Sequence, residues 1–179
     1  MRVIAGNAKG LRLKVPKGVS LRPTSDRIRE SIFAILGDMV IGCEFLDLYA
    51  GTGAVGIEAL SRGAAKAVFV DNDSRCISTI LSNLEVTRLR ERAEVYRNEV
   101  TAALRILKKR GYSFDIIFLD PPYASRLAGK TIEIVGRLGL LREGGVVLAE
   151  HSRREEIPLE LAQLNNVRVE NYGETAISF

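Results

Sequence analysis

The hydrophobic pattern of the chain alternates between two periods. Short, almost continuously apolar runs are followed by longer stretches in which apolar residues recur every three or four positions. The first pattern predicts β-strands that are buried on both faces, and the second predicts amphipathic helices packed against them. Strands are predicted at 45–49, 67–70, 93–96, 114–119 and 146–149, with helices around residues 28–36, 57–60, 77–84, 104–107 and 132–138.

The last thirty residues depart from this alternation. Pro158 predicts the start of a short helix. Two further strands are expected at about 167–172 and 175–179, and the turn at Gly173 predicts that they form an antiparallel hairpin at the sheet edge. The whole pattern indicates an α/β fold: a doubly wound, Rossmann-like, mostly parallel seven-stranded sheet. We expect one main domain at 25–179, preceded by an extension at 1–24.

The cellular compartment is predicted from features that the 179-residue sequence lacks. No apolar run approaches the roughly 20 residues needed to span a bilayer, and no signal-peptide core follows Met1. Cys43 and Cys76 are isolated and form no CxxC or Cys/His grouping, so neither a disulfide framework nor a metal site is expected. We therefore expect a cytoplasmic protein whose two cysteines are small buried side chains.

Positive charge is concentrated at the start of the chain. Residues 1–30 carry eight basic and two acidic side chains, a net charge of +6, whereas the whole chain has +4. The alternating segment 11–15 predicts a small β-hairpin with one basic face. Such an extension favours a polyanionic partner, because Lys and Arg contacts to phosphate dominate nucleic-acid affinity. We predict RNA-backbone contacts by Arg2, Arg12, Arg22 and Arg27, although ion pairing with nearby carboxylates could also explain the arginine cluster at 22–29.

A glycine-rich loop follows the first predicted strand. The segment from Gly51 through Thr52 and Gly53 to Gly56 matches GxGxxG, which is weak evidence for a dinucleotide site. Asp47 changes that interpretation, because a carboxylate at the end of the strand would oppose a pyrophosphate but suits a cationic ligand with a sulfonium and an ammonium group. S-adenosylmethionine is such a ligand. We expect Asp47 and the Gly51–Gly53 backbone to contact its methionine part.

Two later positions extend the predicted donor site. Asp71 ends the second strand and is placed to accept hydrogen bonds from ribose hydroxyls. Asn98 and Glu99 follow the third strand, where this fold commonly contacts adenine. The only histidine, His151, follows Glu150 at a strand end, and we interpret it as structural.

The fourth strand ends in Asp120-Pro121-Pro122-Tyr123. Two consecutive prolines lack backbone donors and fix an extended turn, so the segment offers rigid carbonyl acceptors beside a carboxylate and an aromatic ring. Alone, the tetrapeptide could equally be a solvated turn. Together with the loop and Asp71, it predicts the acceptor half of a methyl-transfer site for a planar amine.

The ends of the chain carry a closer resemblance. The segments 2–6, 22–30, 46–62 and 172–178, of which Arg-Pro-Thr-x-Asp-Arg is the most distinctive, resemble the RsmD type of bacterial 16S rRNA guanine-N2 methyltransferase. The resemblance implies the class I methyltransferase fold, S-adenosylmethionine as donor, and methylation of one guanine N2 in 16S rRNA within an assembling small subunit. We expect 25–179 to be the S-adenosylmethionine-binding catalytic domain and the basic extension 1–24 to contact RNA. Ala5 and Glu99 depart from the usual Gly and Asp of the family, and Glu99 weakens the adenine assignment.

A mechanism follows for this target. The guanine N2 lone pair is delocalised into the ring, so the amine becomes nucleophilic only when it is held out of plane. Asp120 and the Pro121 carbonyl would accept its two N–H groups, and Tyr123 would stack on the base. A paired guanine could not reach this pocket, so the target is expected to be unpaired or flipped out.

Alternatives remain open from the residues alone. An adenine-N6 methyltransferase acting on DNA or RNA would use the same tetrapeptide, and a non-catalytic assembly factor would keep the basic extension. Transfer is expected to be direct, without a covalent intermediate, and the protein is expected to be a monomer with no membrane or metal partner.

Overall fold

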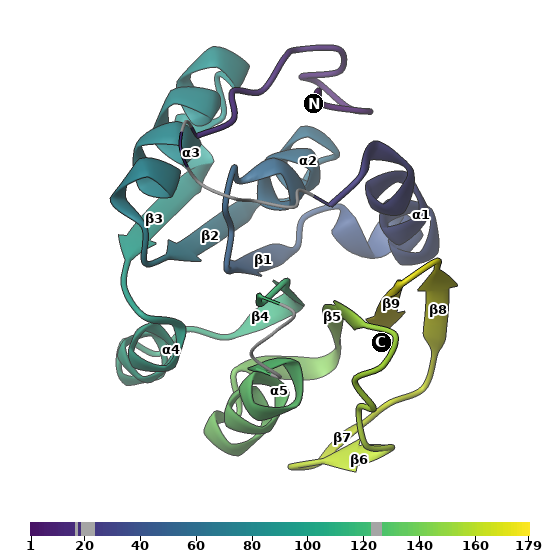
Figure 1. Cartoon of the computed structure of the whole chain (residues 1–179). Helices are drawn as coiled ribbons and strands as arrows, with labels where there is room; N and C mark the ends of the chain where they lie inside the picture. Colours follow the sequence, from purple (N-terminus) through teal and green to yellow (C-terminus); the bar gives the residue numbers. More distant parts are fainter. Residues whose placement is uncertain (17, 19–23, 123–126) are drawn as a thin grey trace.

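A computed structural model of the chain describes residues 1–16, 18, 24–122 and 127–179 (Figure 1). Two of the predicted site residues, Arg22 and Tyr123, lie outside the described residues. No helix in the described ranges has the length and apolar character needed to cross a membrane.

One sheet of seven strands forms the centre of the fold (Figure 1). Its strands are β1 (Glu44–Leu48), β2 (Lys66–Asp71), β3 (Ala93–Arg97), β4 (Phe114–Leu119), β5 (Leu141–Ser152), β8 (Val169–Tyr172) and β9 (Thr175–Ser178). They follow the order β3-β2-β1-β4-β5-β9-β8, in which β1 to β5 are parallel and β9 and β8 are antiparallel additions. The predicted seven-stranded, mostly parallel sheet with an antiparallel edge hairpin is therefore confirmed.

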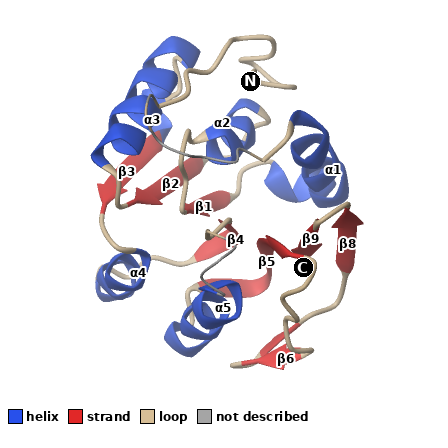
Figure 2. Cartoon of the chain, in the orientation of Figure 1, coloured by secondary structure: helices blue, strands red, loops and turns tan. Residues whose placement is uncertain are grey.

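Helices cover both faces of this sheet (Figure 2). The helices are α1 (Asp26–Leu36), α2 (Ala54–Ser61), α3 (Ser74–Thr87), α4 (Val100–Lys109) and α5 (Leu127–Leu138), with short 3₁₀ turns at Gly37–Val40 and Arg90–Arg92. In β4, Ile116 and Phe118 pack with α1, α2 and α3, whereas Ile117 and Leu119 pack with α4 and α5. Apart from half-buried Asp115 near its start, the strand is apolar, because it is buried on both faces.

The segment after β5 differs from the prediction. The short helix expected at Pro158 is absent, and the chain forms β6 (Glu160–Leu161) and β7 (Leu164–Asn165), a two-stranded hairpin. Ala162 and Gln163 both have positive φ, 48° and 72°, as in the primed turns that match the twist of a tight hairpin. Leu161 and Leu164 pack at the edge of the core on the α5 side. The segment forms a hairpin because this conformation partly buries both leucine side chains.

The N-terminal extension lies against α2. Buried Glu58 accepts hydrogen bonds from the backbone N–H groups of Ile4 and Ala5 at 2.8 and 3.0 Å. Gly6 has φ +79°, and a Cβ there would lie 1.8 Å from the Ser61 carbonyl oxygen, so no other residue fits. Arg2 and Arg12 form a single antiparallel bridge. Because no longer ladder joins them, the predicted N-terminal β-hairpin stays unconfirmed in detail.

Candidate active site

The carboxyl ends of four neighbouring strands bring the predicted site segments to one edge of the sheet. Leu48 of β1 pairs with Val70 of β2 and with Leu119 of β4, so the segments that follow these residues begin side by side. Adjacent strands lie about 4.8 Å apart. Ligands of doubly wound sheets bind beyond this edge. The glycine loop, Asp71 and Asp120 therefore share one region of the molecule, as the sequence predicted.

The glycine loop turns sharply between β1 and α2. Tyr49, Gly51 and Gly53 have φ of 58°, 55° and 75°, and Gly53 is the N-cap of α2. A Cβ on Gly53 would lie 3.2 Å from Cγ1 of Ile80, so the loop passes close to α3. Gly51, Thr52 and Gly53 are buried, and the two glycines leave the helix N-terminus without large side chains, so a ligand can approach its N–H groups closely.

Asp47 lies beneath the loop, within β1. Its side chain is 1% exposed, and Oδ2 accepts the backbone N–H of Gly56 at 2.9 Å. Burial raises the pKa of Asp47 to about 8, although the Gly56 hydrogen bond acts in the opposite direction. A cation that binds next to this buried carboxylate stabilises its ionised form. This fits the predicted contact with a cationic donor.

Replacing Asp47 with Asn should make stability less dependent on pH. The pKa of Asp47 in the folded protein exceeds the unfolded value of about 3.9, so protonation stabilises the folded state. This contribution to the free energy of unfolding is complete below pH 4 and is lost as the pH rises toward 8. We expect Asp47→Asn to unfold several degrees above the wild type at pH 8 and with little difference at pH 4. Thermal unfolding at both pH values measures this, and an equal difference at each would contradict the assignment. The variant should also bind the donor more weakly.

Asp71 organises the two loops that flank the donor site. Its Oδ2 accepts the backbone N–H of Gly51 at 2.8 Å, and Oδ1 accepts that of Asp73 at 2.9 Å. Each carboxylate oxygen has a further lone pair, so these bonds leave capacity for hydroxyl donors. Ribose binding by Asp71 stays a prediction, to which the structure adds a positioning role.

Asn98 and Glu99 follow β3 at the same edge. The Asn98 backbone N–H donates to the Asp71 carbonyl at 3.1 Å. Glu99 caps α4 by accepting the N–H groups of Thr101 and Ala102, both at 2.9 Å. Partial burial raises its pKa, but these hydrogen bonds outweigh it, so the pKa of Glu99 lies below its usual value. An adenine contact by either residue stays a prediction.

The predicted acceptor segment begins where β4 ends. The Asp120 N–H donates to the Leu48 carbonyl at 3.4 Å, which fixes the Asp120 backbone beside the strand that leads into the glycine loop. Asp120 is half-buried, Pro121 is buried and Pro122 is exposed. The catalytic roles of the three residues stay predictions, and Tyr123 is outside the described part of the chain.

His151 and the two cysteines are buried, as expected for residues with structural roles. His151 is 4% exposed, and its ring nitrogens lie 2.9 Å from the Ser152 carbonyl of the same strand and from the Ser178 hydroxyl, the second of which joins β5 to β9. Cys43 and Cys76 are both buried free thiols. Burial raises the pKa of each cysteine to about 12, as expected for packing residues.

Asn83 is a site residue that the sequence analysis missed. This fully buried amide of α3 accepts the Lys14 N–H at 2.8 Å and donates to the carbonyls of Lys14 and Thr52 at 3.1 and 2.9 Å. It therefore ties the N-terminal extension to the glycine loop. The available signal was a lone polar residue on the apolar face of a predicted helix, beside Ile80 and Leu84.

The arginines near the start of the chain lie in two different environments. Arg2, Arg12 and Arg27 are exposed, as phosphate contacts require. Arg29 of the same cluster is fully buried, donates to the Arg2 carbonyl and pairs with Asp26, both from Nη2. Ion pairing thus explains Arg29, whereas it does not explain Arg27 within the described part of the chain.

Comparison with known proteins identifies the family. A family model described as Conserved hypothetical protein 95 matches residues 1–179. The chain belongs to this family. It is similar to YlbH of Bacillus subtilis strain 168, named "Putative rRNA methyltransferase YlbH", which is 43% identical over 99% of the chain and 97% of its own length.

Further comparisons show which type of family member the chain is. "Ribosomal RNA small subunit methyltransferase D" of Escherichia coli K12 is 32% identical over 98% of the chain and 87% of its own length. A solved structure of a hypothetical protein from Thermus thermophilus superimposes with a TM-score of 0.86 at 33% identity, covering 99% of the chain and 97% of that chain. The resemblance to the RsmD type is confirmed along the full chain, and with it the methyltransferase class and fold.

Proposed function

We propose that the protein transfers a methyl group from S-adenosylmethionine to the exocyclic N2 amine of one guanine in 16S rRNA. The observation that carries this proposal is the juxtaposition of Asp120 with the glycine loop in a chain of the RsmD family. The name of the Escherichia coli relative supports ribosomal RNA of the small subunit as the substrate. The base and the atom rest on the resemblance and on the acceptor chemistry of the site.

The residues present suit the proposed donor. S-adenosylmethionine supplies an electrophilic methyl group on a sulfonium centre. Asp47 offers a buried carboxylate whose ionised form a cationic partner would stabilise, and Gly51, Thr52 and Gly53 offer backbone without large side chains. Asp71 would accept the ribose hydroxyls, and Asn98 and Glu99 would lie near the adenine. Together they would hold the donor at the carboxyl edge, beside Asp120.

The chain's own contribution to chemistry is positioning. Asp120 and the Pro121 carbonyl would accept the two N–H groups of the target amine, which directs its lone pair toward the methyl group. Pro122 and Tyr123 would keep the base in that plane. Holding two reactants in this geometry can lower the barrier by several kcal/mol. After transfer the cationic nitrogen is acidic, so Asp120 or water takes its proton and no strong base is needed.

The N-terminal extension would provide the RNA contacts. Residues 1–24 would act as an RNA-binding unit and residues 25–179 as the catalytic domain. Arg2, Arg12, Arg22 and Arg27 would contact phosphates of 16S rRNA in an assembling small subunit. We further propose that the protein acts as a monomer in the cytoplasm.

The test is labelled methyl transfer to naked 16S rRNA, assembling small subunits and duplex DNA, with the product nucleoside identified by mass spectrometry. We expect N2-methylguanosine from the small-subunit substrate. N6-methyladenosine would establish the alternative amino methyltransferase. Donor binding without turnover on all three substrates would contradict the enzymatic proposal.

Removing Arg2 and Arg12 together should weaken RNA binding through charge. The two side chains are exposed on one bridged pair of segments, so we expect Arg2→Gln with Arg12→Gln to reduce the slope of log affinity against log salt by about 2. Affinity measured between about 50 and 200 mM salt tests this. A matched pair of substitutions on α4 and α5, Arg105→Gln with Arg137→Gln, should leave the slope unchanged, and equal effects of both pairs would refute the assignment.

A further inference from the structure

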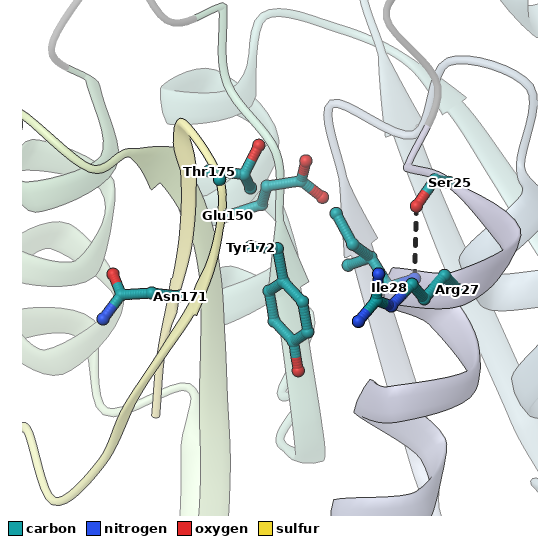
Figure 3. A pocket seen from close by; sticks show the side chains of 8 residues that line it. Ser25, Arg27, Ile28, Glu150, Asn171, Tyr172 and Thr175 are labelled. Carbon is teal, nitrogen blue, oxygen red and sulfur yellow. Dashed lines mark hydrogen bonds between the residues drawn. The ribbon is translucent and has the colours of Figure 1, made fainter.

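A cavity of about 380 Å³ opens between the N-terminal end of α1 and the hairpin of β8 and β9 (Figure 3). Its lining includes Arg27 and Ile28 of α1, Glu150 of β5, and Asn171 and Tyr172 of β8. Asp120, Pro121 and Pro122 do not line it. The cavity is therefore separate from the acceptor segment among the described residues.

The cavity nevertheless lies next to that segment. Leu119 of β4 pairs with Ala149 of β5, so Asp120 and Glu150 are the next residues on two hydrogen-bonded parallel strands. Phe118 and Leu148 pack toward the layer of α1, α2 and α3. Because side chains alternate along a strand, Asp120 and Glu150 project toward the same layer. The cavity thus begins about one strand spacing from the proposed catalytic carboxylate.

The walls of the cavity are fixed by contacts between elements. The Thr24 hydroxyl donates to Oε2 of Glu150 at 2.8 Å, which ties the start of α1 to β5. On the other side, the Tyr172 and Ser31 hydroxyls are hydrogen-bonded, which ties β8 to α1. Tyr172 is also packed against the core, so its ring stays in place independently of the hydroxyl contact. The cavity is therefore preformed, and a preformed site loses less entropy on binding.

The side chains that line it match the parts of an unpaired nucleotide. Arg27 is exposed and positively charged, as a phosphate contact requires, whereas Glu150 is 3% exposed and forms part of the wall through its contact with Thr24. Tyr172 contributes an aromatic ring, and Asn171 an amide that both donates and accepts. Single-stranded RNA is recognised by this combination of aromatic ring, cation and polar groups that meet base edges.

We propose that this cavity is a second nucleotide subsite, which holds an unpaired base that neighbours the methylated guanine. The proposal rests on the proposed function, because it assumes an RNA substrate at Asp120. The subsite would fix the position of the target within the RNA, since a base anchored one strand away sets which nucleotide reaches the donor.

The test is a double-mutant cycle in which Tyr172 and single nucleotides of the RNA are changed separately and together, and the affinity for RNA is measured. The RNA is the 16S rRNA fragment that the wild-type protein binds most tightly, prepared with an abasic nucleotide at each unpaired position in turn. We expect Tyr172→Leu to weaken binding about tenfold, because the stacked ring is lost. One abasic position should weaken wild-type binding to a similar extent but change the affinity of Tyr172→Leu less than about twofold. Fluorescence anisotropy at fixed salt measures each affinity.

Control variants separate the subsite from folding and charge. Tyr172→Phe keeps the ring and loses only the hydroxyl contact with Ser31, so it should bind RNA like the wild type. Arg27→Gln should weaken binding about tenfold, whereas Arg105→Gln, the same charge loss on α4, should not. Donor binding by calorimetry should be unchanged in all four variants.

Two outcomes would overturn the proposal. If every abasic position affects the wild type and Tyr172→Leu equally, no base occupies the cavity. If Tyr172→Phe weakens binding as much as Tyr172→Leu, the residue acts only through its contact with α1. Because the cycle needs no turnover, absence of methyl transfer would overturn the proposed function separately, and would not account for either result.

Discussion

Replacing Asp120 with Ala should abolish methyl transfer while donor binding is retained. Asp120 follows the end of β4, next to the strand that leads into the glycine loop, and its carboxylate would accept an N–H of the target amine and direct its lone pair. A positioned group that acts on a proton of the reacting amine contributes about 100- to 10,000-fold to the rate. We expect kcat to fall about 1,000-fold or more. Single-turnover methyl transfer to the small-subunit substrate measures the loss.

The donor affinity of the same variant tests whether Asp120 acts on the base. Calorimetric titration with S-adenosylmethionine should give a dissociation constant within about twofold of the wild type, since Asp47 and Asp71 are untouched. Asp120→Asn keeps one acceptor oxygen and should retain more activity than Asp120→Ala. Asp38→Ala removes an exposed carboxylate from the 3₁₀ turn after α1 and should have no effect. Wild-type turnover by Asp120→Ala would refute the mechanism.

Replacing Asn83 with Leu should damage stability and donor binding together. The buried amide makes three hydrogen bonds, two to the backbone of Lys14 and one to the Thr52 carbonyl. Leucine keeps the volume but leaves buried backbone groups unpaired, at a cost of about 2–4 kcal/mol. For a chain of this size we expect the midpoint of thermal unfolding to fall by about 5–12 °C. Because Thr52 lies in the glycine loop, donor affinity should fall about tenfold.

A neighbouring residue provides the matched control. Ser82 precedes Asn83 on α3 and contacts the same residue of the extension, through the exposed Lys14 ammonium group at 2.8 Å. Ser82→Ala removes that contact without unpairing a buried group, so stability and donor affinity should change little. If Asn83→Leu lowered stability and left donor affinity unchanged, Asn83 would anchor the extension without shaping the loop.

The central sheet was predictable because its signals are local. The apolar run at 114–119 coincides with β4 (Phe114–Leu119), and the turn at Gly173 joins the predicted hairpin. Asp47, Asp71 and Asp120 could be assigned to one edge because the carboxyl ends of parallel strands always meet there. The order of residues along the chain was sufficient for that inference.

The failed or incomplete predictions involve longer-range contacts. Proline is enriched at the first position of helices, yet the segment after Pro158 is a hairpin because Leu161 and Leu164 are partly buried near α5. The predicted adenine ligand Glu99 also caps α4, a role that its position before a helical stretch could have indicated. Arg29 could not be separated from Arg27 by sequence, since helix periodicity does not say which basic residue meets a buried carbonyl.

The sequence by itself determined the family, the fold class and the groups available for chemistry, because motifs and hydrophobic periods are written in neighbouring residues. Only the tertiary structure decided how the parts are joined. Asn83 connects the extension to the glycine loop across 69 and 31 positions, and Glu150 meets Thr24 across 126. Such pairs carry no local signature, since a buried amide or carboxylate is satisfied by whichever segment the packing of the sheet and helices brings beside it.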